Sequence, residues 1–415
     1  MNPITQTNNL VKNVSHYLPA GKIVPCRWGL RCANGSACKY WHNNQMKVVP
    51  LCGFGQSCRN RGKTCFLSHD ILAYDSSLIC QYGLKCYKHC SKVHPIEANQ
   101  AGLGKCYLLH RAVQCTNNLS DDLFKISVFD STKILSPDPN LVFKINYGLN
   151  VTIERYFFIP NHTYQIFSNK KLGGGTLGLG NVQEEKLMMI FSTLQYLLYG
   201  FHYEKSSPLS NNLEYDPIVI NTMVVAKDNS YEGCKSNLDS PHYGTNGLKI
   251  AHDKRVADSL YDPIDKPFPV KTICVAVPSF KDWSGVCYND SVLQHVFYTL
   301  YKSLVTSIVA NECDNQVSES IIHIGNIGCG VFGHNYNTIY ILQHLAMSCA
   351  VSLINPQKKI IVMYHAYDEK TYAGLVQNAI PSLTEWMYSG KNIGTILSEI
   401  RQKQLQFPDT WAKKI

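Results

Sequence analysis

At 415 residues, the chain is long enough for two or three domains, one of them with a sizeable core. Its charge is uneven: residues 1–100 hold 12 Lys and Arg against three acidic residues, a net +9, whereas the other 315 residues hold 27 of each sign. This asymmetry predicts a polyanion-binding segment joined to a near-neutral domain. No apolar run approaches the about 20 residues that cross a bilayer, and the polar N-terminus lacks a signal peptide's apolar stretch. We therefore expect a soluble intracellular protein, nuclear or cytoplasmic, with no membrane partner.

Nine of the 17 cysteines form an ordered array in the first quarter of the chain. Three units, 26–42, 52–69 and 80–94, each contain three cysteines and a histidine, with three residues between the third cysteine and the histidine. Three thiolates and one imidazole form a closed tetrahedral Zn²⁺ site, and modules this small depend on the metal for folding. The units resemble CCCH zinc fingers, which implies three structural zinc ions and no organic cofactor. The predicted ligands are Cys26, Cys32, Cys38, His42, Cys52, Cys58, Cys65, His69, Cys80, Cys86, Cys90 and His94.

Two alternatives remain for the cysteine array. A disulfide framework would need an oxidising compartment and would not explain the regularly placed histidines. In the third unit, His89 could replace Cys90 as a ligand, because the segment Cys80 to Lys88 resembles the opening of the poly(ADP-ribose)-binding C2H2 finger. The sequence therefore leaves open whether this finger binds RNA or ADP-ribose polymer.

Aromatic and basic residues alternate between the predicted zinc ligands. Bases stack on exposed aromatic rings at about 1–3 kcal/mol each, while cations follow the phosphates of a single strand. We expect about half of these rings to form the fingers' own small cores instead. Single-stranded RNA is the partner that the resemblance implies. The residues concerned are Trp28, Tyr40, Trp41, Phe54, Phe66, Tyr82 and Tyr87, with Arg27, Arg31, Lys39, Arg59, Lys63, Lys85 and Lys88.

The predicted organisation has five parts, and the fourth is an α/β domain. They are a flexible N-terminus (1–20), the fingers (21–95), a connector (96–122), the α/β domain (123–378) and a C-terminal helical extension (379–415). Within the domain, apolar β-rich runs alternate with helical stretches, which predicts a sheet covered by helices on both faces. The expected strands are 163–168, 217–221, 272–277, 320–324 and 359–364, and the expected long helices are 291–309 and 338–353. Residues 201–269, rich in Asn, Asp, Ser and Pro, are expected to form a loop-rich insertion.

A strand, a glycine loop and a helix are predicted between Thr163 and Phe191. The loop contains Gly173-Gly174-Gly175, and the helix begins at Gln183-Glu184-Glu185. A glycine triplet lets the backbone approach a bulky anion, and a helix N-terminus favours negative charge. This layout is typical of a nucleotide-diphosphate site.

With its flanks, Phe167-Ser168-Asn169-x3-Gly-Gly-Gly-x7-Gln-Glu-Glu resembles the signature of the poly(ADP-ribose) glycohydrolases, macrodomain-fold hydrolases that cleave the ribose–ribose bond of ADP-ribose chains. A second segment, from Gly325 to His334, resembles the Gly-x-x-Gly-Cys-Gly-x-Phe-Gly loop of the same family, most closely its microbial-type members. The alternative is two unrelated glycine turns. The resemblance implies a macrodomain-like mixed sheet covered by helices on both faces and a substrate that is poly(ADP-ribose) or an ADP-ribosylated protein.

Cleavage of an O-glycosidic bond needs a proton for the leaving oxygen. Glu184 and Glu185 point about 100° apart on a helix, so they cannot flank one sugar as a conventional glycosidase pair does. The resemblance assigns the acid/base role to Glu185, ribose binding to Glu184, and a place against the scissile ribose to Asn169. Two carboxylates beside a diphosphate should raise the pKa of at least one of them. A solvated helix start is the alternative for such a pair.

The resemblance also implies which residues bind the substrate. They are Asn169, Gly173, Gly174, Gly175, Gln183, Gly328, Cys329, Gly330, Val331, Phe332 and Gly333. Phe332 is expected to pack on the distal ribose, or alternatively in the core, and Cys329 has no partnering base that would make it a nucleophile. His323 and His334 are expected to be structural. The residue that stacks on adenine is left open, with Tyr231 and Tyr243 as suggestions.

Three function classes follow from these patterns. The first is a glycohydrolase of poly(ADP-ribose) that its zinc fingers bring to single-stranded RNA or ADP-ribose polymer. The second is a non-hydrolytic binder of ADP-ribose and RNA. The third is a CCCH RNA-regulatory protein that acts on another ADP-ribose derivative. The sequence leaves open chain-end against chain-interior cleavage and the oligomeric state.

Overall fold

The computed structural model describes residues 11–13, 126–129, 134–170, 172–174, 182–191, 194, 212–229, 260–279, 288, 290–314, 318–330 and 332–403. The fingers, the connector, Gly175, Val331, Tyr231 and Tyr243 lie outside these residues, so their predictions remain predictions.

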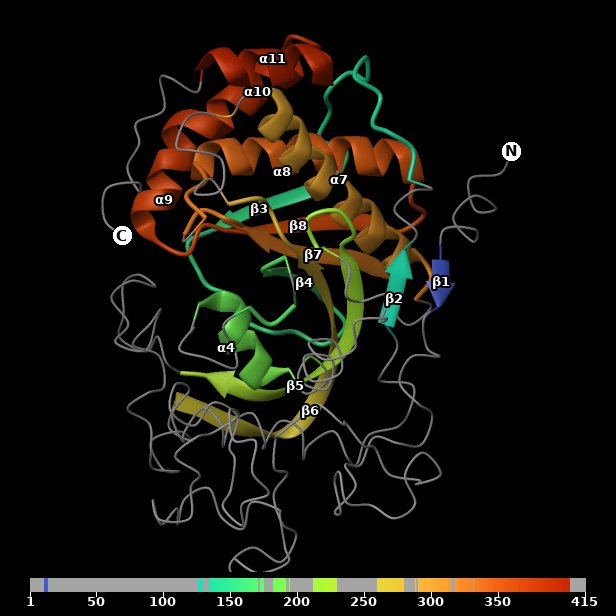
Figure 1. The fold of residues 1–415 in the computed structure, drawn as a ribbon, viewed down its shortest axis with the longest axis vertical. Coiled ribbons are helices and arrows are strands. Elements are labelled where there is room, and N and C mark those ends of the chain that lie inside the picture. Colours follow the sequence, from blue (N-terminus) through green and yellow to red (C-terminus); the bar gives the residue numbers. More distant parts are fainter. Residues whose placement is uncertain are drawn as a thin grey trace, which may run out of the picture.

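The described chain is built around one mixed sheet of eight strands in the order β1-β2-β5-β6-β4-β7-β8-β3 (Figure 1). Five adjacent strands are parallel to one another: β6, β4, β7, β8 and β3. The other three, β1, β2 and β5, pair antiparallel with their neighbours. The strands are β1 (Val11–Asn13), β2 (Ile126–Phe129), β3 (Gly148–Thr152), β4 (Thr163–Phe167), β5 (Ile218–Asp228), β6 (Tyr261–Val275), β7 (Glu319–Gly325) and β8 (Lys359–His365).

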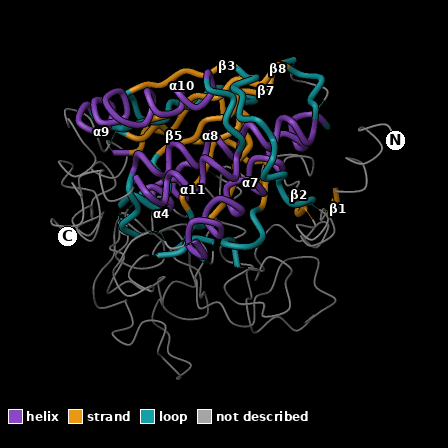
Figure 2. Tube along the Cα trace, turned by 90° about the horizontal axis from the view of Figure 1, so that it is seen from above, coloured by secondary structure: helices purple, strands orange, loops and turns teal. Residues whose placement is uncertain are grey.

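Helices cover both faces of the sheet, as the alternating pattern predicted. Helices α7 and α8 lie against one face and α4 against the other (Figure 1), and a view at right angles shows the same layering (Figure 2). The described helices are α4 (Gln183–Ile190), α7 (Asp290–Glu312), α8 (Tyr336–Ile354), α9 (Glu369–Gly374), the π-helix η12 (Leu375–Ala379), α10 (Ile380–Tyr388) and α11 (Ile393–Lys403).

Strands β5 and β6 contribute to both cores because successive side chains point to opposite faces. Val219 and Ile273 face the larger core beneath α7 and α8. Ile218 and Cys274, one position away, face the smaller core beneath α4. The continuous apolar strands of the sequence are therefore explained by burial on both sides.

Helix α8 passes the length and hydropathy test for a membrane span, but 89% of its apolar window is buried inside the protein. A helix that is apolar all round is expected when protein surrounds it. Its start is fixed by Asn335, whose side-chain oxygen accepts hydrogen bonds from the N–H groups of Asn337 and Thr338, at 2.9 and 3.1 Å. Here α8 is a core helix.

The prediction of a loop-rich insertion over 201–269 is wrong where β5 and the first part of β6 lie. β6 pairs with β5 along nearly its whole length, but with β4 only from Lys271 to Val275. Prolines 263, 267 and 269 therefore lie where one edge of β6 has no partner in the described sheet. Proline lacks an N–H group, and a strand tolerates this at such an edge. The Pro and Asp content of the segment therefore did not indicate a loop.

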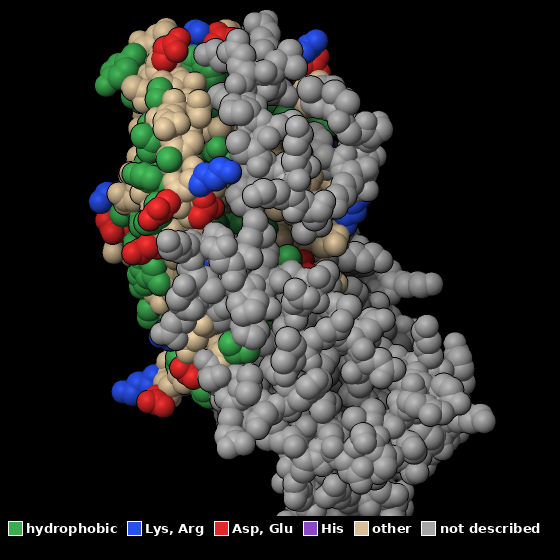
Figure 3. Space-filling model, turned by 90° about the vertical axis from the view of Figure 1, so that its left-hand side faces the viewer, with side chains coloured by type: hydrophobic (Ala, Val, Ile, Leu, Met, Phe, Trp, Pro, Cys, Tyr) green, Lys and Arg blue, Asp and Glu red, His purple; other side chains and the backbone are tan. Residues whose placement is uncertain are grey.

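The two ends of the described chain both contact the domain. Val11–Asn13, within the segment expected to be flexible, pair with β2. Helices α10 and α11 occupy the start of the expected C-terminal extension, and Trp386, Ile396 and Ile400 bury their side chains in the larger core. On the face shown in Figure 3, the described acidic and basic side chains are interspersed, which agrees with the equal numbers of each in residues 101–415.

Candidate active site

The two glycine motifs meet because β4 and β7 are neighbours and parallel. The carboxyl ends of parallel strands lie at one edge of a sheet, so the loop after β4 and the loop after β7 leave from the same edge. Helix α7 connects β6 to β7 and thereby crosses β4, which lies between them. The sequence motifs, 150 residues apart in the chain, are thus brought together by strand order.

Gln183 attaches the start of α4 to the end of β4. Its Oε1 accepts a hydrogen bond from the N–H of Phe167 at 2.8 Å, and its Nε2 donates to the carbonyl of Gln165 at 3.3 Å. Glu185 Oε2 accepts from the N–H of Val182 at 2.9 Å and satisfies one of the free N–H groups at the helix start. The Gln-Glu-Glu motif therefore fixes where the helix begins.

Glu184 binds the glycine loop with both oxygens. Oε2 accepts from the N–H of Asn169 at 3.0 Å, and Oε1 accepts from the N–H of Gly173 at 2.7 Å. The side chain is buried, and burial, followed by the nearby charge of Glu185, raises the pKa of Glu184 well above its ordinary value. The two backbone hydrogen bonds oppose this rise because they favour the ionised form.

Both carboxyl groups approach Gly174. A Cβ added there would lie 2.5 Å from Glu184 Oε2 and 2.8 Å from Glu185 Oε1. Gly174 also has a φ of 43°, in the left-handed region that favours glycine, so the position excludes a side chain on two grounds. Two side chains that leave the helix in different directions thus converge on one loop residue.

The second loop is held from three sides. The Asn326 side chain donates to the carbonyl of Ala366 at 2.8 Å and accepts from the Tyr364 hydroxyl at 2.7 Å. Gln343 of α8 donates to the carbonyl of Gly325 at 2.7 Å. A Cβ on Gly330 would meet nothing within 4 Å, so the middle of the loop borders open space. The loop is fixed at its base and open at its tip.

His334 is buried with both ring nitrogens bonded inside the protein. Nε2 lies 2.7 Å from the carbonyl of Pro278, which can only accept, so Nε2 carries the proton and Nδ1 accepts from the Tyr288 hydroxyl at 2.9 Å. Burial lowers the pKa of His334 to about 4, so the ring is neutral near pH 7. These contacts match the structural role expected for it.

The thiol and the phenyl ring of this loop differ in exposure. Cys329 is buried, and burial raises its pKa, which disfavours the thiolate a nucleophile needs. Phe332 is partly buried and packs against the larger core, so part of its ring belongs to the fold. The expected contact of Phe332 with a ribose remains a prediction.

Tyr367, which follows β8, belongs to the candidate site, although the sequence analysis did not identify it. A Cβ on Gly325 would lie 2.7 Å from Tyr367 Cε2 and 3.1 Å from Phe167 Cζ. Gln183 Nε2 also donates to the Tyr367 hydroxyl at 3.5 Å. The ends of three strands and the start of α4 therefore converge at this tyrosine.

A cavity of about 320 Å³ adjoins Gln183 and Tyr367. Aromatic rings form part of its wall, and basic groups form another part. Its lining consists of Arg155, Tyr156, Phe158, Gln183, Lys186, Leu187, Ile190, Lys227, Asp228, Asn229 and Tyr367. The run Arg155-Tyr156-Phe157-Phe158 just before β4 was the signal in the sequence that could have indicated this wall.

Three histidines form a hydrogen-bonded chain across the sheet beside this cavity. His162 Nδ1 lies 2.9 Å from His323 Nε2, and His323 Nδ1 lies 2.9 Å from His365 Nε2. His365 Nδ1 lies 2.9 Å from the carbonyl of Glu154. Because that carbonyl can only accept, each ring donates from Nδ1 to the next group. The Tyr156 ring meets His365 edge-on, with centroids 4.8 Å apart, so the chain supports the cavity wall.

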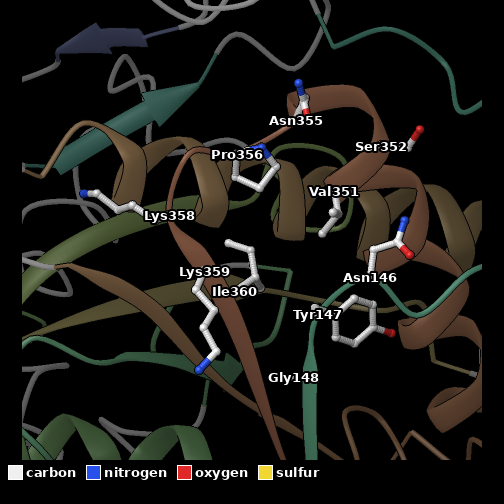
Figure 4. A pocket seen from close by; sticks show the side chains of 10 residues that line it. All are labelled: Asn146, Tyr147, Gly148, Val351, Ser352, Asn355, Pro356, Lys358, Lys359 and Ile360. Atoms are coloured by element: carbon white, nitrogen blue, oxygen red, sulfur yellow. The ribbon is translucent and has the colours of Figure 1, made fainter.

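A second cavity, of about 610 Å³, lies elsewhere in the described part of the chain. It is formed by the start of β3, the start of β8 and the end of α8, as Figure 4 shows. Parallel β3 and β8 begin there, so this cavity lies at the edge of the sheet opposite the glycine loops. None of the predicted site residues lines it.

The structure places nine of the predicted substrate-binding residues, and Gly175 and Val331 lie outside its described part. Among the described residues, no group of three or more His, Cys, Asp or Glu side chains could hold a metal ion. The twelve predicted zinc ligands are not among those residues.

Comparison with known proteins gives a weak structural likeness. No family model and no curated protein matches the chain. Among solved structures, poly(ADP-ribose) glycohydrolase from Thermomonospora curvata is 13% identical with a TM-score of 0.38, covering 65% of this chain and 88% of that one. The Deinococcus radiodurans enzyme in complex with ADP-ribose is 17% identical with a TM-score of 0.38, covering 58% and 86%. With scores this low, the functional interpretation depends on the residues described above.

Proposed function

We propose that this protein hydrolyses the ribose–ribose bonds of poly(ADP-ribose) and releases ADP-ribose, in a domain of macrodomain type. The observation that carries the proposal is the convergence of Glu184 and Glu185 on Gly174, beside a second glycine loop at the same edge of the sheet. Backbone N–H groups of such loops suit a diphosphate. Two carboxyl groups next to them suit a reaction that needs a proton donor.

In this proposal Glu185 protonates the leaving oxygen and then activates water. Glu184 holds the loop and the ribose: its oxygens already bind two backbone N–H groups, which leaves remaining lone pairs for a ribose hydroxyl. Asn169 lies at the end of the segment that Glu184 fixes, which favours its contact with the scissile ribose. Adenine is placed in the cavity beside Gln183, where Tyr156 and Tyr367 offer ring faces or edges.

The zinc fingers, in the same proposal, bring the hydrolase to single-stranded RNA or ADP-ribose polymer. Their support is the cysteine and histidine spacing and the net +9 of residues 1–100.

The test is the release of ADP-ribose from protein-bound poly(ADP-ribose), followed by chromatography. The purified full chain should release ADP-ribose, and Glu185→Ala should abolish the release while keeping the dissociation constant for ADP-ribose within about tenfold. Glu319→Ala, whose carboxylate pairs with Lys359 on the surface, is the matched control and should retain full activity. Full activity of Glu185→Ala would refute its role. Binding of ADP-ribose with no release by the full chain would favour a binding module instead.

A further inference from the structure

The cavity beside Gln183 carries more positive charge than a nucleobase needs. Three basic side chains, Arg155, Lys186 and Lys227, line it together with one carboxylate, Asp228. Adenine is uncharged near neutral pH and is held by stacking and hydrogen bonds. The basic groups therefore suit an anionic part of the ligand.

Lys186 is the least expected of these groups. It follows Glu185 on α4 and is 1% exposed, with buried Leu187 and Met188 after it. Its Nζ lies 3.8 Å from Asp228 Oδ2, beyond hydrogen-bond distance for that pair. Lys186 therefore brings a buried ammonium group to the wall of the cavity.

The diphosphate of the reacting ADP-ribose unit is assigned to the glycine loops, so the cavity would take a different phosphate. The polymer continues from the 2′-oxygen of the adenosine, where the next ribose and its diphosphate are attached. A ligand with its base in the cavity would carry this extension close to the same basic groups.

We propose that Arg155, Lys186 and Lys227 bind a phosphate carried by the adenosine beyond the reacting diphosphate. This inference depends on the proposed function. The site then prefers ADP-ribose that is extended or phosphorylated at the 2′-oxygen over free ADP-ribose. A further polymer unit and a 2′-phosphate share this chemistry.

Calorimetric titration of the full chain with ADP-ribose and with ADP-ribose 2′-phosphate tests the proposal. We expect the 2′-phosphate to bind about tenfold more tightly or better, and the advantage to shrink as salt is raised. Lys227→Met, at an exposed position, should reduce that advantage to about threefold or less while the affinity for ADP-ribose stays within about threefold. Lys186→Met should do the same if it folds. Lys359→Met, on the far part of β8, should keep the full advantage.

The outcomes separate this inference from the proposed function. Equal affinities for the two ligands, or an advantage that survives Lys227→Met, would overturn the inference while ADP-ribose still binds. Absence of binding to ADP-ribose itself would overturn the proposed function as well. A dimer of ADP-ribose, titrated into Glu185→Ala, identifies the source. Tighter binding of the dimer than of the 2′-phosphate assigns the subsite to polymer, and the reverse order assigns it to a phosphorylated mononucleotide.

Discussion

Glu184 and Glu185 are adjacent in the chain, but their carboxyl groups have different partners. Glu184 holds the loop between Asn169 and Gly173, whereas Glu185 accepts from the backbone at the start of its own helix. The difference predicts that their replacement will affect stability and activity in different proportions.

Glu184→Ala should lower both activity and stability. The change removes the acceptor of the N–H groups of exposed Asn169 and buried Gly173, and an unsatisfied N–H that water cannot reach costs about 1–3 kcal/mol. We expect activity to fall by at least about a hundredfold because the ribose and the loop lose their position. Urea unfolding and the release assay measure the two effects. Wild-type turnover would contradict this role.

Gly174→Ala tests the crowding between the loop and the carboxyl groups. The new Cβ would displace both carboxyl groups and also meet an unfavourable φ, so activity should fall by at least about a hundredfold. Gly390→Ala is the matched control: its φ is 66°, but a Cβ there would meet nothing within 4 Å. It should lose about 1 kcal/mol of stability and keep its activity. Equal activity of both variants would show that the crowding is unimportant.

Among the elements, β4, β7 and β8 are joined by the chain of His162, His323 and His365. Burial lowers the pKa of all three rings, that of His323 to about 2 and that of His365 to about 4. The neighbouring histidines also lower the pKa of His323, and the surrounding tyrosines are uncharged in acid. The folded chain therefore takes up fewer protons than the unfolded chain between about pH 6.5 and pH 4.

The free energy of unfolding should consequently fall as the pH drops below about 6.5. Above pH 6.5 these three histidines should not change it. His323→Gln removes one such ring, so the stability advantage of the wild type over this variant should shrink by about 1–2 kcal/mol between pH 7 and pH 5. Urea unfolding of both full chains at pH 7, 6 and 5 measures the difference, and acid effects on other groups cancel. A constant advantage over this range would contradict the prediction.

Periodicity and motifs in the sequence predicted individual strands and helices better than they predicted which residues strand order brings together. The strand before Ser168, the helix at Gln183 and the long helices over 291–309 and 338–353 are confirmed, because apolar pattern and length decide such elements locally. The start of β5 was expected as a strand at 217–221. The first part of β6 was not expected, because it contains Pro and Asp residues that are typical of loops but that a free sheet edge tolerates. Tyr367 was missed because only strand order brings it to Gln183, and one sequence contains no signal for that order. Arg155 was missed although it begins the aromatic run before β4 that could have indicated the cavity wall.

At the scale of the whole molecule, the first prediction concerns metal content. The purified chain should carry three Zn²⁺, all bound by residues 21–95, because this segment contains three sets of Cys and His with CCCH spacing. Elemental analysis of the full chain and of a form lacking residues 21–95 measures this. Zinc that remains with the shortened form would contradict the assignment.

The second prediction concerns the proposed delivery of the hydrolase by the predicted zinc fingers. Removal of residues 21–95 leaves Val11–Asn13, which pair with β2, in the chain. This deletion should barely change turnover of a small soluble substrate, but it should weaken binding to single-stranded RNA or long ADP-ribose polymer and reduce the salt dependence of that binding. Competition between poly(A) and poly(ADP-ribose) on the full chain identifies the preferred partner. Unchanged binding of both polyanions would refute delivery by the fingers.

The two hydrogen bonds of Glu184 also set a limit on evolution. One carboxylate spans Asn169 and Gly173, so the number of residues between them must suit its reach. An insertion or deletion within this interval would detach one end, even if every catalytic side chain were retained. Relatives with the same chemistry should therefore vary in side chains between these two positions and keep the interval constant, while length changes accumulate elsewhere.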